Sequence, residues 1–300
     1  MSSKPIVIAL RSDYHNLSSK LQLLLKSFLN SEIRTKKIII KINLCDARTP
    51  EVGAITHPLF LDALLQYLRS FCSNTEIYVV ESDATVVLAD EFIRWFGFEP
   101  ILSRWNAQWI NLSKINSIKK ILNGLFFKEI ELPEIFEDEF FFISLAKLKT
   151  NILTKISCVL KNQFGCLPKV EKNEYHPYIH EAIVDINSVL RPHLSLVDGI
   201  VAMGGAQGPA FGIPINANII IGSQDPVATD SFCARIMGFN PYFIPHIRKA
   251  NKKKIGSIKY TLSSDIVPKI DFEINKWEMT LFRLGGKIKR KSQIRLRRKS

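Results

Sequence analysis

Lysines at three places in the chain, together with one histidine, have the chemistry to hold a small anion and to move a proton. Lys41 ends the run KIIIK, Lys149 follows the apolar run FFISLA, and Lys161 lies on the flank of an apolar helical face. Lysine ammonium groups bind carboxylate and phosphate oxygens. His57 titrates near neutral pH and is the candidate for proton transfer. Solvated strand ends and helix edges explain the same lysines without a function, and a lone histidine is often structural.

A glycine-rich loop follows an apolar run in the second half of the chain. Gly204, Gly205, Gly208 and Gly212 fall within nine residues. Glycine tolerates positive φ and lets a ligand approach the backbone closely. The loop lacks the GK[ST] of a P-loop, and its glycines lie between two predicted strands, unlike those of a dinucleotide-binding turn. We expect a loop that contacts a ligand, with a wide proline-containing turn as the structural alternative.

A single acid, Asp198, interrupts the mostly apolar run LSLVDGIVAM. A buried carboxylate needs partners, because desolvation otherwise raises its pKa. Backbone N–H groups, a lysine or a metal ion would each serve. Free N–H groups at the start of the helix predicted after the GAITHP segment (53–58) would bind an anion, or Thr56 would simply cap that helix. We predict His57, Lys161 and Asp198 as catalytic candidates and, as ligand-binding residues, Lys41, Asn43, Arg48, Thr56, Lys149, Asn162, Gly204, Gly205 and Gly208.

The five cysteines are scattered along the chain, at positions 45, 72, 158, 166 and 233, and none form C-x-x-C. This spacing argues against a disulfide framework, a local zinc site and an iron–sulfur cluster. We expect no metal site and no intrinsic iron–sulfur cluster, and most cysteines should be buried apolar fillers. A redox role would therefore need an external electron-transfer protein. The paired acids of ESD (81–83) follow a strand and would bind a cation or take a proton, or else Ser82 or Asp83 would cap a helix.

Short apolar runs alternate with helical patterns, which predicts an α/β fold with a mostly parallel, doubly wound sheet. The predicted strands are 6–10, 37–44, 76–81, 109–112, 124–132, 140–145, 194–203, 218–221 and 257–262, and the predicted helices are 17–29, 57–71, 90–96, 152–164, 176–190, 226–237 and 241–251. Ligands of open α/β sheets bind beyond the carboxyl ends of strands. We therefore expect residues 41–48, residues 147–151 and the glycine-rich loop to meet in one cleft.

Composition is ordinary for a soluble globular protein, with 46% hydrophobic and 23% charged residues. We predict an N-terminal lobe (1–125), a C-terminal lobe (126–275) with a cleft between the two, and a basic tail (276–300). The net charge of +13 lies mostly in the tail, because residues 287–300 hold eight Lys or Arg and no acid. Such a tail contacts nucleic acid or an anionic surface, or only solubilises the chain. With no apolar run long enough for a membrane span and no signal-peptide layout, we expect a cytoplasmic protein.

An ordered series of segments resembles domain-of-unknown-function family 362. The segments are KINL (41–44), GAITHP (53–58), VVES (79–82), LAKLKT (145–150), LKNQFGCLP (160–168), EAIVDI (181–186), LVDGIVAMGGAQGP (196–209), SQDPVATD (223–230) and IMGFNP (236–241). The resemblance covers roughly residues 37–250. It implies an intracellular α/β protein and supplies no settled reaction.

Three departures from the family pattern weaken the enzymatic interpretation. Many members carry a ferredoxin-like cysteine module, which is absent from this sequence. Members often have histidine where this chain has Asn151, and an acidic residue in the glycine loop where it has Gly204, Gly205 and Gln207. A site that used those groups for electron or proton transfer would be altered.

Two classes of function therefore stay open. In the first, the protein is an enzyme that acts on a small anionic substrate in the cleft between the lobes. In the second, it is a non-catalytic binding protein whose basic tail contacts nucleic acid or an anionic surface.

Overall fold

The computed structural model describes residues 3–29, 35–205, 212–264 and 270–273. Its main strands are β1 (Ile6–Arg11), β2 (Lys37–Lys41), β3 (Glu76–Glu81), β4 (Gln108–Asn111), β7 (Phe141–Asn151), β8 (Lys155–Ser157), β9 (Leu194–Gly204), β10 (Ile213–Ser223) and β11 (Thr261–Ser264). They form one sheet in the order β11-β1-β10-β9-β7-β2-β3-β4, with β8 paired to β7. Neighbouring strands are parallel, except where β10 meets β1 and β9 and where β8 meets β7. The predicted α/β fold with a mostly parallel sheet is confirmed.

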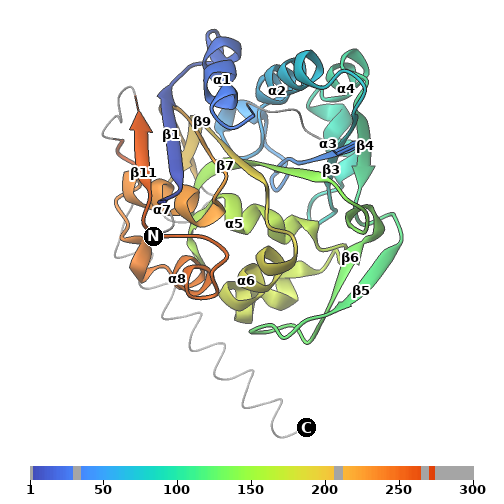
Figure 1. Ribbon diagram of the computed structural model, residues 1–300, viewed down its shortest axis with the longest axis vertical. Coiled ribbons are helices and arrows are strands. Elements are labelled where there is room, and N and C mark those ends of the chain that lie inside the picture. Colours follow the sequence, from blue (N-terminus) through green and yellow to red (C-terminus); the bar gives the residue numbers. More distant parts are fainter. Residues whose placement is uncertain (1–2, 30–34, 206–211, 265–269, 274–300) are drawn as a thin grey trace, which may run out of the picture.

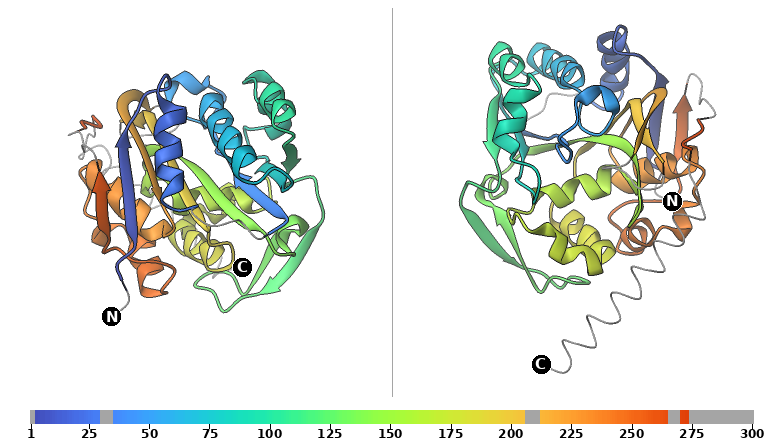
Figure 2. Two further views of the ribbon diagram at one scale, coloured as in Figure 1. Left: turned by 45° about the horizontal axis from the view of Figure 1, so that its top comes forward. Right: turned by 180° about the vertical axis from the view of Figure 1, so that it is seen from behind.

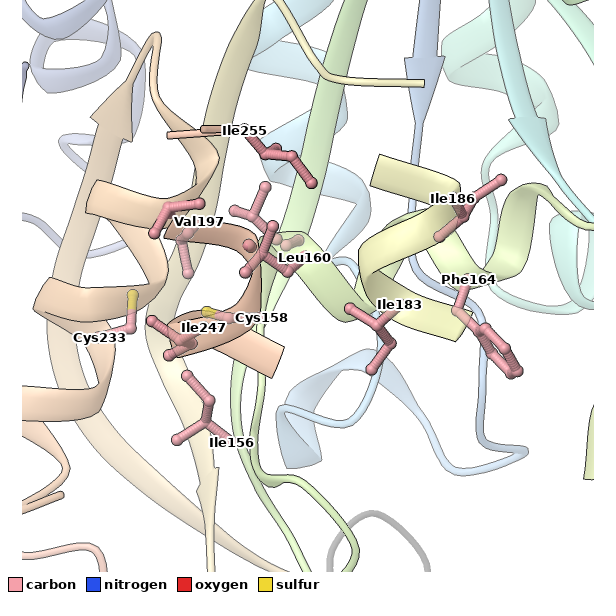
Figure 3. Close-up of a cluster of buried hydrophobic side chains, with 14 of the residues drawn as sticks. Ile156, Cys158, Leu160, Phe164, Ile183, Ile186, Val197, Cys233, Ile247 and Ile255 are labelled. Carbon is pink, nitrogen blue, oxygen red and sulfur yellow. The ribbon is translucent and has the colours of Figure 1, made fainter. Parts of the chain in front are cut away.

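Helices cover both faces of the sheet (Figures 1 and 2). The first layer holds α1 (Leu17–Lys26), α2 (Pro58–Phe71), α3 (Ala89–Trp95) and α4 (Glu99–Arg104), and the second holds α5 (Val159–Asn162), α6 (Ile179–Val189), α7 (Pro226–Ile236) and α8 (Pro245–Lys252). Side chains alternate across each strand, so Ile38 and Ile40 of β2 pack in the core under the first layer and Ile39 in the core under the second. Figure 3 shows Cys158 and Leu160 within the second core.

A two-stranded hairpin, β5 (Ser117–Ile121) and β6 (Glu129–Pro133), stands apart from the main sheet. The buried carboxylate of Asp185 accepts the N–H groups of Leu125, Phe126 and Phe127 at 2.7–2.9 Å, which fastens the turn of the hairpin to α6. Short 3₁₀ segments complete the described elements: Pro50–Val52, Glu134–Phe136, Gln163–Cys166, Lys172–Tyr178 and Pro241–Phe243.

Strands from both predicted lobes alternate within the one sheet. β7 pairs with β2, and both β10 and β11 pair with β1, so residues before and after position 125 are neighbours at three places in this sheet. The division into lobes at residue 125, and the cleft between them, stay predictions. The predicted tail, 276–300, lies outside the described residues.

The helix predicted over 152–164 is wrong. β7 continues to Asn151, the chain turns back as β8, and only Val159–Asn162 is α-helical. The Asn151 side chain accepts the N–H groups of Leu153 and Thr154, which closes the turn. The buried carboxylate of Asp230 then accepts the N–H groups that begin α5. The apolar spacing of this stretch thus reflects a buried strand followed by a short helix, which periodicity alone does not distinguish from one helix.

Candidate functional site

Lys41 is fully buried at the end of β2, and its charge is balanced there. Its Nζ lies 2.7 Å from Glu81 Oε1 and donates to the carbonyl of Ile42 at 2.7 Å. Glu81 also accepts the N–H groups of Leu44 and Ser82. Glu81, one of the paired acids expected to bind a cation or take a proton, therefore neutralises the lysine at the end of the neighbouring strand β2. A role for Lys41 in binding a ligand stays a prediction.

Lys149 lies on β7 with an exposed fraction of only 1%. Its Nζ donates to Asn43 Oδ1 at 2.6 Å and to the Ala54 carbonyl at 2.7 Å, and it lies 2.9 Å from Cys45 Sγ. No carboxylate pairs with this ammonium in the part of the chain that the structure describes. Lys149 is therefore held rigidly without a salt bridge, and the acid that its charge does reach, Asp46, is paired with Arg48.

Two asparagines join the strand ends to α5. Asn43 Nδ2 donates to Asn162 Oδ1 at 3.2 Å, and Asn162 Nδ2 donates to the Lys41 carbonyl at 3.1 Å and to Ser144 Oγ at 3.0 Å. Because these bonds connect β2, β7 and α5, they fix the backbone of α5 beside the carboxyl end of β2, at the level of Ser144 within β7. That edge is where open α/β sheets bind ligands.

Lys161 is the neighbour of Asn162 on α5, and it is half-buried. Among the described residues, no acceptor or acid lies within bonding distance of its ammonium. Burial lowers the pKa of Lys161 to about 8; Cys45 opposes the shift and the positive charge of Lys149 adds to it. Burial lowers the pKa of His246, and the charges of His180 and Lys161 add to that shift. Asn43, Cys45, Lys149, Lys161 and Asn162 are hereafter called the lysine site.

Arg48 connects the loop after β2 to the strand pair β9–β10. Its guanidinium binds both carboxylate oxygens of Asp46, at 2.9–3.0 Å, and donates to the Gly212 carbonyl at 3.0 Å. Burial favours the neutral acid at Asp46, but the hydrogen bonds and charge of Arg48 outweigh it and lower the pKa of that carboxyl. These contacts give Arg48 a structural task, and a role in ligand binding stays a prediction.

His57 and Asp198 belong to a second cluster rather than to the lysine site. Asp198 pairs with Lys147 at 2.6 Å, with both side chains fully buried, and the Tyr14 hydroxyl lies 3.4 Å from each of them. His57 stacks on Tyr14 with ring centroids 4.0 Å apart. Burial lowers the pKa of His57, and the Asp198 charge partly opposes the shift. Backbone N–H groups, a lysine or a metal ion were the expected partners of Asp198, and the structure pairs it with Lys147.

The helix cap at the start of α2 differs from the prediction. His57, not Thr56, is the capping residue, because its Nδ1 accepts the N–H of Leu59 at 3.2 Å. Thr56 Oγ1 instead accepts the N–H of Asn43 at 2.8 Å. The Nδ1 of His57 is therefore engaged, and its Nε2 is the nitrogen left for other partners.

The described glycines of the loop have structural reasons for their identity. A Cβ at Gly204 would lie 2.5 Å from the Phe272 carbonyl oxygen, and Gly205 has a φ of +82°. Gly208 lies outside the described residues. Contact of these glycines with a ligand stays a prediction, although Arg48 does bring the loop's far end, Gly212, beside the rim after β2.

Two members of these clusters were missed in the sequence. Cys45 is partly exposed and touches Lys149. The other cysteines are buried, as expected for most of the five: Cys72, Cys158, Cys166 and Cys233. Tyr14 joins the second cluster from before α1. The contacts of Cys45 with Lys149 and of Tyr14 with Asp198 leave no local signal, because each joins residues more than 100 positions apart in sequence.

Comparison with known proteins bears on the fold and the family. The model of the family "Domain of unknown function (DUF362)" matches residues 38–235. The chain belongs to this family. It is similar to the thylakoid-associated protein sll1697 of Synechocystis, with 23% identity over 250 residues, 81% of this chain and 76% of that protein. In the described residues, every helix is too short or too polar to cross a membrane.

Among solved structures, the chain is similar to the lactate racemase apoprotein from Thermoanaerobacterium thermosaccharolyticum. Its TM-score is 0.42 at 16% identity, and the match covers 78% of this chain and 57% of that chain. This DUF362 chain therefore spans little more than half of that protein's length.

Proposed function

We propose that this DUF362 protein is an enzyme that binds a small anionic substrate at the lysine site. The observation that carries the proposal is a pair of ammonium groups, Lys149 and Lys161, that form no salt bridge with a carboxylate in the described part of the chain. Asp46, the acid that the Lys149 charge reaches, is itself paired with Arg48. Lys41 and Lys147, by contrast, each have a buried acid. An anion would supply the missing charge. The cleft predicted between two lobes stays part of this proposal.

The electrostatic gain from such an anion is large enough to matter. Two opposite unit charges ~4 Å apart attract by about 4 kcal/mol at an effective dielectric constant near 20. Desolvation of the anion offsets part of this gain. The asparagine bonds hold the site before the ligand arrives, so little conformational entropy is lost on binding. Small carboxylates and phosphates are the ligand classes that fit.

Within this proposal Lys161 is the group that moves a proton. Efficient general acids and bases have pKa values near the working pH, and the pKa of Lys161 is about 8. His57 and Asp198, the other catalytic candidates, would act from the second cluster, because the charged groups that shift His57 are Asp198, Lys147 and Glu51. The loop residues 54–57 connect the two clusters, since Lys149 binds the Ala54 carbonyl.

Equilibrium dialysis against acetate, pyruvate and phosphate, combined with thermal unfolding, tests the proposal. At 100 times its Kd, a bound anion stabilises the fold by about 2.7 kcal/mol. Lys161→Gln should weaken binding about tenfold, equivalent to about 1.4 kcal/mol. Lys172→Gln is the matched control, because Lys172 is also buried but donates to the Asp83 carbonyl. Absence of binding by every anion, or equal losses in both variants, would refute the proposal.

Contact of the tail with nucleic acid or an anionic surface, an external electron-transfer protein and a cytoplasmic location all stay predictions. No contact of a described residue favours any of them over the lysine site.

A further inference from the structure

Among the residues that the structure describes, none bonds the amine of Lys161, whereas the buried lysines of the same region are each held by a partner. Lys41 and Lys147 are fixed by acids, and Lys149 by Asn43 and Ala54. Lys172, the other lysine whose pKa burial lowers to about 8, is fixed on the Asp83 carbonyl. The nitrogen of Lys161 is therefore the one that can approach a ligand without first breaking a bond to a described residue.

The backbone that carries Lys161 is rigid even though its amine is unattached. Asp230 accepts the N–H groups of Val159 and Leu160 at 2.8 and 3.1 Å, and Asn162 binds the carbonyl of Lys41. Leu160 is buried in the second core (Figure 3). A short helix held on both sides in this way positions the next side chain reproducibly, which nucleophilic catalysis requires.

We infer that Lys161 is a nucleophile that forms an imine with a small oxo acid, whose carboxylate binds at Lys149. This inference rests on the proposed function, since it names the substrate class of the same site. Lys149 Nζ already has three contacts, so it would exchange the weakest of them, with Cys45 Sγ, for the carboxylate. The unattached amine of Lys161, which is close enough for the Lys149 charge to act on it, would meet the carbonyl carbon. Lysines activated by burial and by a second cation use this chemistry on carbonyl substrates.

The balance of the reaction needs no oxidant or reductant. The lone pair of Lys161 Nζ attacks the carbonyl carbon and forms a C–N bond, and a proton moves from nitrogen to the former carbonyl oxygen. That hydroxyl then takes one proton from solvent and leaves as water as the C=N bond forms. Amine, carbonyl compound and one proton thus give a protonated imine and one water. Burial and the Lys149 charge supply the neutral amine at pH 8.

Reductive trapping on the full-length protein tests the inference. The protein is incubated at pH 8 with pyruvate or acetoacetate, reduced with borohydride, digested, and mapped by mass spectrometry. We expect a saturable adduct on Lys161, at least tenfold more abundant than on any other lysine. It should disappear in Lys161→Arg and persist in Lys172→Gln. Excess acetate, which has no carbonyl group to react, should compete with its formation.

Three outcomes distinguish imine formation at Lys161 from the anion binding that was proposed for the same site. A dominant adduct on Lys161 of the wild-type protein supports the inference. This result does not depend on whether any variant folds. Anion binding by dialysis without an adduct on Lys161, or with adducts spread over exposed lysines only, overturns the imine and leaves the proposed function intact. Absence of both anion binding and the adduct overturns both.

Discussion

Replacing Asp198 by asparagine should destabilise the protein more than most single substitutions, because it leaves the Lys147 ammonium unpaired inside the fold. Both side chains are fully buried, and their atoms lie 2.6 Å apart. Breaking a buried pair by removing one partner costs about 3–5 kcal/mol. Asparagine keeps the shape and can still accept the N–H of Ile200, which now bonds Asp198 at 3.1 Å. The Tyr14 contacts, at 3.4 Å, are too long to replace the carboxylate.

The free energy of unfolding from urea titration, followed by tryptophan fluorescence, measures this loss. The double variant Asp198→Asn with Lys147→Met removes both charges and should recover most of the loss, because uncharged replacements of a buried pair are often neutral. Asp138→Asn is the control; Asp138 pairs with Lys37 at 3.5 Å with 87% of its side chain exposed, so it should cost under about 1 kcal/mol. If the single and double variants lost equal free energy, the unpaired ammonium would not be the cause.

Two further predictions concern other parts of the fold. Burial lowers the pKa of Lys172 to about 8 in the folded protein, from 10.5 in the unfolded chain. Between pH 8 and pH 10.5 the unfolded chain therefore binds one more proton than the folded protein. The free energy of unfolding then rises with pH by about 1.4 kcal/mol per pH unit. Urea unfolding at pH 8 and pH 10 should show a smaller rise in the free energy of unfolding for Lys172→Gln than for the wild-type protein. An equal rise in both proteins would show that Lys172 is not its source. Asp185→Ala should release the turn at residues 125–127, at a cost of about 1–3 kcal/mol. Limited proteolysis should then cleave the variant there first, and equal cleavage of both proteins would count against the anchoring role.

The sequence predicted the parts of the fold that depend on local patterns. Apolar runs located the buried strands, and the breaks after them located most helices, because burial on both faces of a parallel strand leaves a continuous apolar signal. The stretch 152–164 failed because a strand end and a short helix, joined by a turn that Asn151 stabilises, have the same apolar spacing as one helix.

The candidate site was predictable only as a set of strand ends. Lys149, Asn43 and Asn162 do lie together, because each is at or beside the carboxyl end of β2 or β7. The sequence could not predict which lysine has an acidic partner. Lys41 pairs with Glu81 because β2 and β3 are neighbours in the sheet, and the sequence alone does not give that order. Tyr14 contacts Asp198 across a separation of 184 residues in sequence, so composition and local spacing could not predict that contact.

The position of β1 has a consequence for how the chain is made. β1 lies between β10 and β11, with Ile8 opposite Gly222 and Ile6 opposite Thr261. During synthesis at about 5–20 residues per second, roughly 10–40 seconds separate the emergence of the first strand from that of its partners. For that interval an apolar strand has both edges open to other chains. The ribosome-bound protein should therefore depend on chaperones that cover extended segments until its last quarter emerges.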